Sequence, residues 1–81
     1  MEYNEIQELY RWCQQGNIPC TIAPLFDGWK ITFADGADIV QHMGSYGGQK
    51  GYLEPCGFGE KYDYTPIALI YCWALVKARY R

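Results

Sequence analysis

Apolar side chains recur along residues 3–15 at the spacing of one helix face. Four of them follow the i, i+3, i+4, i+7 pattern: Ile6, Leu9, Tyr10 and Cys13. Glutamates lie near the start of this segment, and Gly16 stands where a glycine follows the C-cap of a helix. The pattern therefore predicts an amphipathic helix over residues 3–15.

Alternating apolar side chains then flank an Asp-Gly pair, which is a preferred two-residue hairpin turn of type I′. With Asp27-Gly28 as the turn, the predicted cross-strand pairs are Phe26 with Trp29, Pro24 with Ile31, and Ile22 with Phe33. These six side chains would share one face of the sheet with Cys20. Because proline cannot donate to the ladder, the first strand is expected at an edge or with a bulge at Pro24.

A second turn signal, Asp35-Gly36, leads into a short apolar segment over residues 38–42. The length of its loop is open, so either Ile39 or Val40 faces the core. Glycines are frequent from residue 36 to residue 59 and flank a short run over residues 51–54, which is a candidate fourth strand.

The last helix is predicted to open at Thr65-Pro66 and is uncharged from Ile67 to Val76. We expect one face to pack on the sheet: Ile67, Ile70, Tyr71 and Ala74. The opposite face would then form a homodimer interface: Leu69, Trp73, Val76 and Tyr80. The alternative is that the N-terminal helix covers this second face within one chain, through Tyr3, Tyr10 or Trp12.

The predicted order of elements is α-β-β-β-(β)-α, in one domain over residues 1–81. We expect an α+β fold of two layers, with an antiparallel sheet of three to four strands and two helices on one face. This order also resembles that of the double-stranded-RNA-binding domain. The lysine cluster that opens the last helix in that family is absent, because this chain has Lys61-Tyr-Asp-Tyr-Thr-Pro66 there.

Charge and segment lengths exclude several classes of protein. The net charge of −2 disfavours both a protein that neutralises nucleic-acid phosphates and an acidic mimic of DNA. The chain starts with a polar, acidic segment, so we expect no signal peptide. The apolar run of the last helix is about half as long as the roughly 20 residues that span a bilayer. We therefore expect a soluble cytoplasmic protein with no membrane partner.

Four cysteines fall within apolar patterns and never as Cys-x-x-Cys: Cys13, Cys20, Cys56 and Cys72. His42, the single histidine, has no cysteine near it in the sequence. These features predict buried free thiols rather than disulfides, a metal site or a cofactor site.

The glycine-rich segment from Gly44 to Gly51 is the strongest candidate for a recognition loop. It and its flank carry side chains typical of an adaptable binding surface: Tyr46, Gln49, Lys50 and Tyr52. A catalytic alternative uses His42 as a general base beside Asp38, which lies four residues earlier on the same strand face. No nucleophile paired with this histidine can be identified. We therefore expect no catalytic residues.

Four stretches of the chain resemble small proteins encoded by bacterial phages and prophages: Asp27–Phe33, Asp35–Val40, Ser45–Gly47 and Gly51–Pro55. The resemblance implies an origin rather than an activity, because accessory genes of this kind often encode compact inhibitors of host enzymes or defence systems. We expect a small non-enzymatic binding protein that modulates a host protein by occlusion. The alternatives are a nucleic-acid-binding accessory protein and a small enzyme that uses His42.

Overall fold

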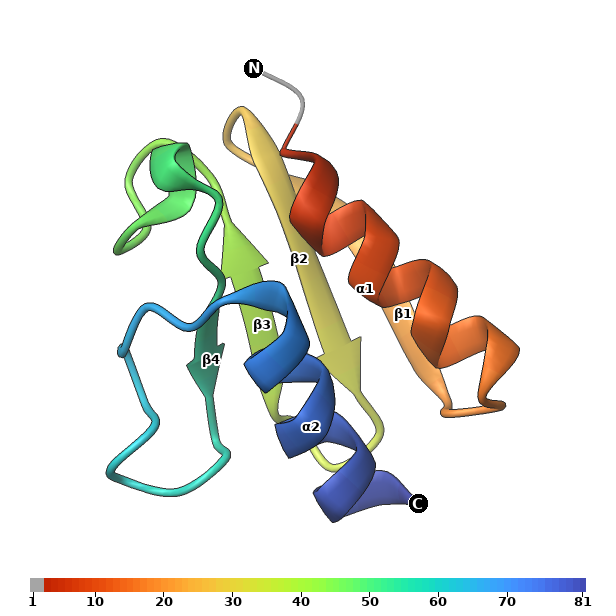
Figure 1. The fold of residues 1–81 in the computed structure, drawn as a ribbon. Helices are drawn as coiled ribbons and strands as arrows, with labels where there is room; N and C mark the ends of the chain where they lie inside the picture. Colours follow the sequence, from red (N-terminus) through yellow and green to blue (C-terminus); the bar gives the residue numbers. More distant parts are fainter. Residues whose placement is uncertain (1–2) are drawn as a thin grey trace.

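The computed structural model describes residues 3–81, which form a four-stranded antiparallel sheet and two α-helices (Figure 1). The elements are α1 (Asn4–Gln15), β1 (Cys20–Leu25), β2 (Gly28–Phe33), β3 (Asp38–Gln41), the short 3-10 helix η1 (Gly48–Lys50), β4 (Glu54–Cys56) and α2 (Leu69–Tyr80). The strands lie in sequence order, and both helices cover the same face of the sheet. The predicted two-layer α+β fold is confirmed, with the fourth strand present.

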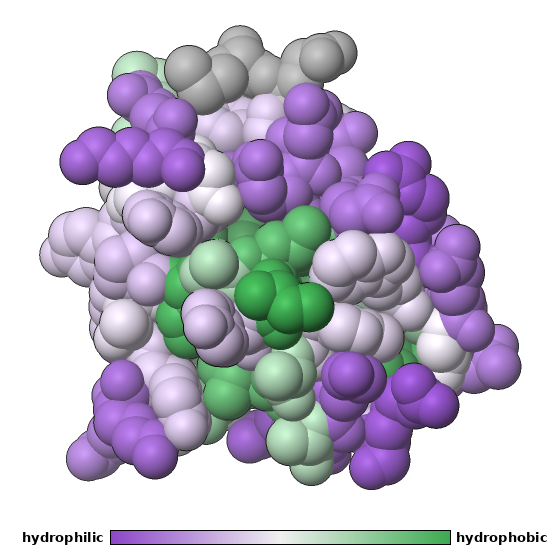
Figure 2. Space-filling model, in the orientation of Figure 1, coloured by the Kyte–Doolittle hydropathy of each residue, from purple (hydrophilic) through white to green (hydrophobic). Residues whose placement is uncertain are grey.

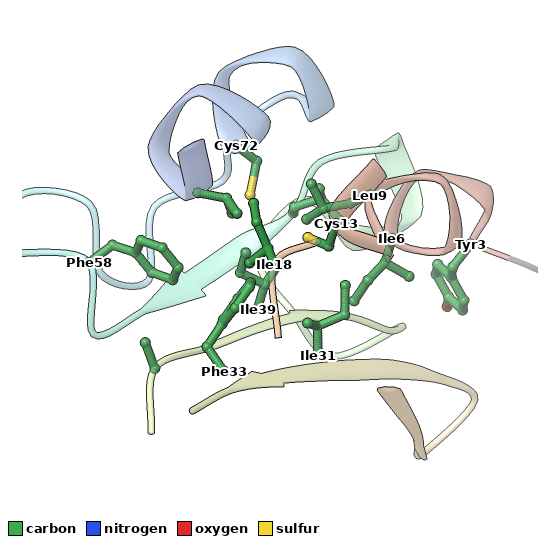
Figure 3. Close-up of a cluster of buried hydrophobic side chains, with 13 residues drawn as sticks. Tyr3, Ile6, Leu9, Cys13, Ile18, Ile31, Phe33, Ile39, Phe58 and Cys72 are labelled. Carbon is green, nitrogen blue, oxygen red and sulfur yellow. The ribbon is translucent and has the colours of Figure 1, made fainter. Parts of the chain in front are cut away.

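The hydrophobic core lies between the helices and the covered face of the sheet (Figure 3). Its fully buried side chains come from both helices, two strands and the segment before β4: Ile6, Leu9, Cys13, Ile31, Ile39, Leu53, Cys72 and Val76. Of the two candidates on β3, Ile39 faces the core, because it pairs with the core residue Ile31. No helix among residues 3–81 has the length and apolar character needed to cross a membrane.

Helix α1 ends at Gln15 as predicted, but Gly16 has a different role from the expected one. Gly16 is the C-cap itself, with an ordinary φ of −86°, and Asn17 takes the left-handed position with a φ of 58°. The amide of Ile18 donates to the carbonyl of Cys13 at 2.9 Å, and the amide of Asn17 donates to the carbonyl of Gln14 at 3.1 Å. This pair of bonds is a Schellman motif in which asparagine replaces glycine.

The hairpin between β1 and β2 has a different register from the predicted one. Pro24 lies opposite Trp29 and Ile22 opposite Ile31, so the turn falls on Phe26 and Asp27. The predicted pairing was wrong because Gly28 is needed within the strand, where a Cβ atom would lie 1.9 Å from the carbonyl oxygen of Gln41. Pairing moves by two residues, an even number, so the side chains that stay in the strands keep their predicted face. The expectation for Phe26 was wrong, because this residue lies in the turn and is 82% exposed.

The fourth strand and the last helix both begin later than predicted. Strand β4 starts at Glu54, and the preceding Leu53 instead pairs with Ile67 through two backbone hydrogen bonds of 2.8 Å. Ile67 is therefore held in extended structure, which delays the start of α2 to Leu69.

The two faces of α2 are reversed relative to the sequence analysis. Val76 is fully buried, and the ring of Tyr80 stacks on Phe33 with a centroid distance of 4.6 Å. By contrast, Ile70 and Tyr71 are 62% and 69% exposed, so the expectation that they pack on the sheet was wrong. The two faces carry similar apolar character, which left the orientation undetermined by sequence periodicity.

The side of α2 assigned to a dimer is largely covered within one chain. Leu69 and Trp73 are partly buried against the core, and Trp73 contacts Trp12 of α1 with a centroid distance of 5.8 Å. This is the arrangement expected if the N-terminal helix covers that side. A homodimer stays a prediction, and a dimer formed through α2 would use the opposite, exposed face of this helix.

Candidate functional site

A groove of about 740 Å³ runs beside the N-terminal half of α2. We call it the tyrosine groove and define it by its lining residues: Tyr52, Lys61, Tyr62, Thr65, Pro66, Ile67, Ala68, Tyr71, Ala74 and Leu75. One wall is α2, and the other is the segment that leads into the helix. Its lining is mostly apolar and aromatic, with a few polar groups, which is the usual character of a binding site.

The wall opposite α2 is fixed to the sheet by backbone hydrogen bonds. Besides the Leu53–Ile67 pair, the amide of Tyr64 donates to the carbonyl of Pro55 on β4 at 3.0 Å. Asp63 closes the adjoining loop, because its carboxylate accepts from the amides of Gly57 and Phe58 at 2.8 and 3.2 Å. The groove is therefore built on a braced backbone rather than on a free loop.

A close backbone approach joins this wall to the glycine-rich loop. Gly47 has a φ of +71°, and a Cβ atom there would lie 2.9 Å from side-chain atoms of both Pro66 and Tyr52. The amide of Tyr52 also donates to the carbonyl of Gly47 at 3.0 Å. These contacts place the aromatic ring of Tyr52 at the groove although it lies far from α2 in the sequence.

The lining carries three phenol hydroxyls and one charge. Tyr52, Tyr62 and Tyr71 have no hydrogen-bond partner for their hydroxyls among residues 3–81. Lys61 is the only charged lining residue in the described part of the chain, and its Nζ lies 4.8 Å from the ring centroid of Tyr62. The groove thus presents phenol hydroxyls and one ammonium group beside aromatic surfaces.

The exposed face of α2 extends the groove into a larger apolar surface. Figure 2 shows hydrophobic residues gathered over α2 and surrounded by hydrophilic ones. Ile70 and Tyr71 are the large exposed side chains of this helix, and Tyr52 is 43% exposed beside it. Exposed apolar patches with a polar rim are typical of protein interaction sites.

The four predicted binding residues do not form a single site. Tyr52 lines the tyrosine groove, whereas Gln49 and Lys50 line a separate polar depression of about 400 Å³ beside the start of α1. Tyr46 is 61% exposed and lines neither cavity.

The loop that carries these residues is anchored by a buried glutamine on β3. The side-chain oxygen of Gln41 accepts from the amide of Ile6 at 3.0 Å, and its nitrogen donates to Glu5 Oε1 at 2.9 Å and to the carbonyl of Gly48 at 3.0 Å. Gln41 is fully buried, so it connects the start of α1 to η1 within the interior.

His42, its proposed partner Asp38 and the nearby Ser45 make other contacts. The amide of Gly44 donates to His42 Nδ1 at 3.0 Å, and the imidazole ring lies 5.0 Å from the ring of Phe26. The hydroxyl of Ser45 donates to the backbone carbonyl of His42 at 2.9 Å. Asp38 instead lies 3.9 Å from Lys30 Nζ on β2. The described contacts therefore place neither Ser45 nor Asp38 on the imidazole ring.

All four cysteines are free thiols. Cys13 and Cys72 are buried as predicted, whereas Cys20 and Cys56 are only partly buried. Burial raises the pKa of Cys13 and of Cys72 to about 12, which keeps both thiols protonated near neutral pH. Within residues 3–81, no group of three histidine, cysteine, aspartate or glutamate side chains is placed to hold a metal ion.

The sequence analysis missed Lys61, Tyr62 and Tyr71 as members of a binding site. Tyr71 was assigned to the sheet, and the other two belong to a segment with no recognisable motif. The available signal was the density of tyrosines before the last helix, but only the Leu53–Ile67 pairing brings that segment against α2 and Tyr52.

The fold and the groove define a small α+β protein with an aromatic groove beside its last helix. No protein-family model, curated protein or solved structure matches this chain.

Proposed function

We propose that this chain is a non-enzymatic binding protein whose tyrosine groove, together with the exposed Ile70 and Tyr71 of α2, contacts a protein partner. The observation that carries the proposal is the pairing of exposed Ile70 and Tyr71 with a braced groove lined by three tyrosines. Tyrosine and other aromatic side chains supply a large share of binding energy in protein interfaces.

The proposed mode of action is occlusion of the partner's surface. The chain offers a rigid convex helix and an adjoining groove, so binding covers a partner without requiring any chemical step. The resemblance of four sequence stretches to phage-encoded proteins suggests a host protein as the partner and an inhibitory effect as the outcome.

The test is affinity capture from lysate of the cells in which the protein acts, with and without nuclease. Two matched variants on α2 separate the groove from the rest of the helix. Ala74→Glu places a charge in the groove lining, and Ala78→Glu places the same charge one turn further along, at an exposed position outside the lining. Both substitutions are at exposed positions of a helix, so both variants should fold.

We expect the wild type and Ala78→Glu to retain the same protein, and Ala74→Glu to lose it. Capture should survive nuclease treatment. Recovery of nucleic acid alone, or equal capture by both variants, would show that the proposed surface is wrong.

A further inference from the structure

The side chains of the tyrosine groove favour one kind of partner segment. The inference drawn from them rests on the function proposed above. We infer that the tyrosine groove binds an extended, proline-rich segment with an adjoining acidic residue. Aromatic-lined grooves are the usual receptors for polyproline II segments, because proline rings pack flat against aromatic faces.

The unpaired hydroxyls favour an extended segment over a helix. A polyproline II segment has no internal hydrogen bonds, so its carbonyl groups are free to accept from a receptor. A bound α-helix uses its backbone carbonyls internally, so only its side chains or solvent could accept from the hydroxyls of Tyr52, Tyr62 and Tyr71. None of these hydroxyls has a partner within residues 3–81.

Addition of a strand to the sheet at this groove is excluded by the backbone contacts. Leu53 and Ile67 already exchange both of their backbone hydrogen bonds, at 2.8 Å each. The carbonyl of Pro55 is likewise taken by the amide of Tyr64. A segment in the groove must therefore be recognised by side chains.

Charge complementarity determines the residue that flanks the prolines. Lys61 has no ion-pair partner among residues 3–81, and no carboxylate lines the groove in that range. Its position over the ring of Tyr62 puts a positive charge at the aromatic surface. A glutamate or aspartate next to the bound prolines supplies the missing partner.

The experiment is an NMR titration of the isotope-labelled full chain with a synthetic peptide, Glu-Glu-Pro-Pro-Leu-Pro-Pro-Ala-Pro. Matched peptides replace all prolines by alanine or both glutamates by lysine, and a fourth is an amphipathic helical peptide of similar length. The expected result is that the first peptide shifts the amide signals of groove residues, and that the alanine peptide does not.

Three variants test which side chains of the groove contact the peptide. Tyr71→Ala should weaken binding of the first peptide at least about tenfold, because it removes an aromatic wall. Lys61→Ala should weaken binding of the first peptide by up to about fivefold. This variant should bind the first peptide and the peptide with lysines in place of glutamates equally well. Ala78→Glu should bind like the wild type.

Three outcomes would overturn the inference, and they separate it from the proposed function. Groove shifts with the helical peptide alone would make the occupant a helix, while the groove remained a protein-binding surface. Concentration-dependent groove shifts without any peptide would make the occupant a second copy of this chain. Absence of groove shifts with the proline peptide up to about 2 mM would exclude even weak recognition of the extended segment.

Discussion

At the scale of single residues, Gln41 connects three parts of the chain through one buried amide group. Its side chain holds the backbone of Ile6 at the start of α1, the side chain of Glu5, and the carbonyl of Gly48 in η1. Removal of such a group lowers the free energy of unfolding, because its buried partners stay away from water but lose their hydrogen bonds.

We predict that Gln41→Leu lowers the free energy of unfolding by about 1–3 kcal/mol, since it leaves the buried amide of Ile6 unpaired and removes one of the two hydrogen bonds to the carbonyl of Gly48. The measurement is urea unfolding at neutral pH. Gln49→Leu is the matched control, because Gln49 is exposed, and it should change stability by less than about 0.5 kcal/mol. Similar losses in both variants would contradict the assigned role of Gln41.

Asp27 shows how a residue recognised from the sequence has a different role in the structure. Its pair with Gly28 was interpreted as the centre of a two-residue turn. The carboxylate instead accepts from the hydroxyl of Tyr3 at 2.6 Å and from the amide of Met43 at 2.9 Å. Neither partner is close in sequence, so turn propensity alone could not predict these bonds.

At the scale of secondary-structure elements, α2 is the helix whose orientation decides where binding occurs. Its buried face presents Cys72 and Val76 to the core, and its other face presents Ile70 and Tyr71 to solvent. Stability measurements can distinguish the two faces without any knowledge of the partner.

We predict that Val76→Ala lowers the free energy of unfolding by about 2 kcal/mol, because it leaves a cavity in the core. Ile70→Ala should change stability by less than about 0.5 kcal/mol, since Ile70 is 62% exposed and alanine favours helix. Thermal or urea unfolding of the two variants provides the comparison. A larger loss in Ile70→Ala would mean that the sheet-facing side of α2 is the other one.

The elements themselves were largely predictable, because their patterns are local. The periodicity of α1 and the alternation of β1 and β2 identify each element and the face that it buries. The bounds of β4 and α2 were not predictable, because they depend on the bond between Leu53 and Ile67, which lie 14 residues apart. The groove depends on the same long-range pairing.

At the scale of the whole molecule, several groups have altered pKa values that link stability to pH. Burial raises the pKa of Cys13 and Cys72 from 9.0 to about 12. Burial and a hydrogen bond to an aspartate raise the pKa of Tyr3 and Tyr80 from 10.0 to about 12. In the unfolded chain these groups lose their protons at lower pH than in the folded protein.

The free energy of unfolding should therefore stay level below about pH 8 and fall as the pH rises from about 9 to 12. Urea unfolding at pH 7, 9, 10 and 11 measures this dependence. Cys72→Ala removes one of the titrating groups, so its stability should decline less over the same range, although it starts lower because of the cavity. Equal stability of the wild type at pH 7 and pH 11 would contradict the burial of these groups.

Two aspartates, Asp27 and Asp35, affect the free energy of unfolding at acidic pH. The hydrogen bond from Tyr3 lowers the pKa of Asp27, and the hydrogen bond from Tyr80 lowers that of Asp35. Asp35 also binds Arg79, with its Oδ2 atom 2.9 Å from a guanidinium nitrogen, so it ties the end of α2 to the turn between β2 and β3. These contributions are present above the ordinary pKa of 3.8 and are lost as the pH falls.

The central claim is that the tyrosine groove contacts a protein partner, and site-specific photo-crosslinking in living cells tests it most directly. The crosslinker p-benzoylphenylalanine would replace Tyr71 in the groove or, as a control, the exposed Thr21 on β1. We predict a discrete crosslinked protein from position 71 and none from position 21. A crosslink from position 21 with none from position 71 would contradict the account.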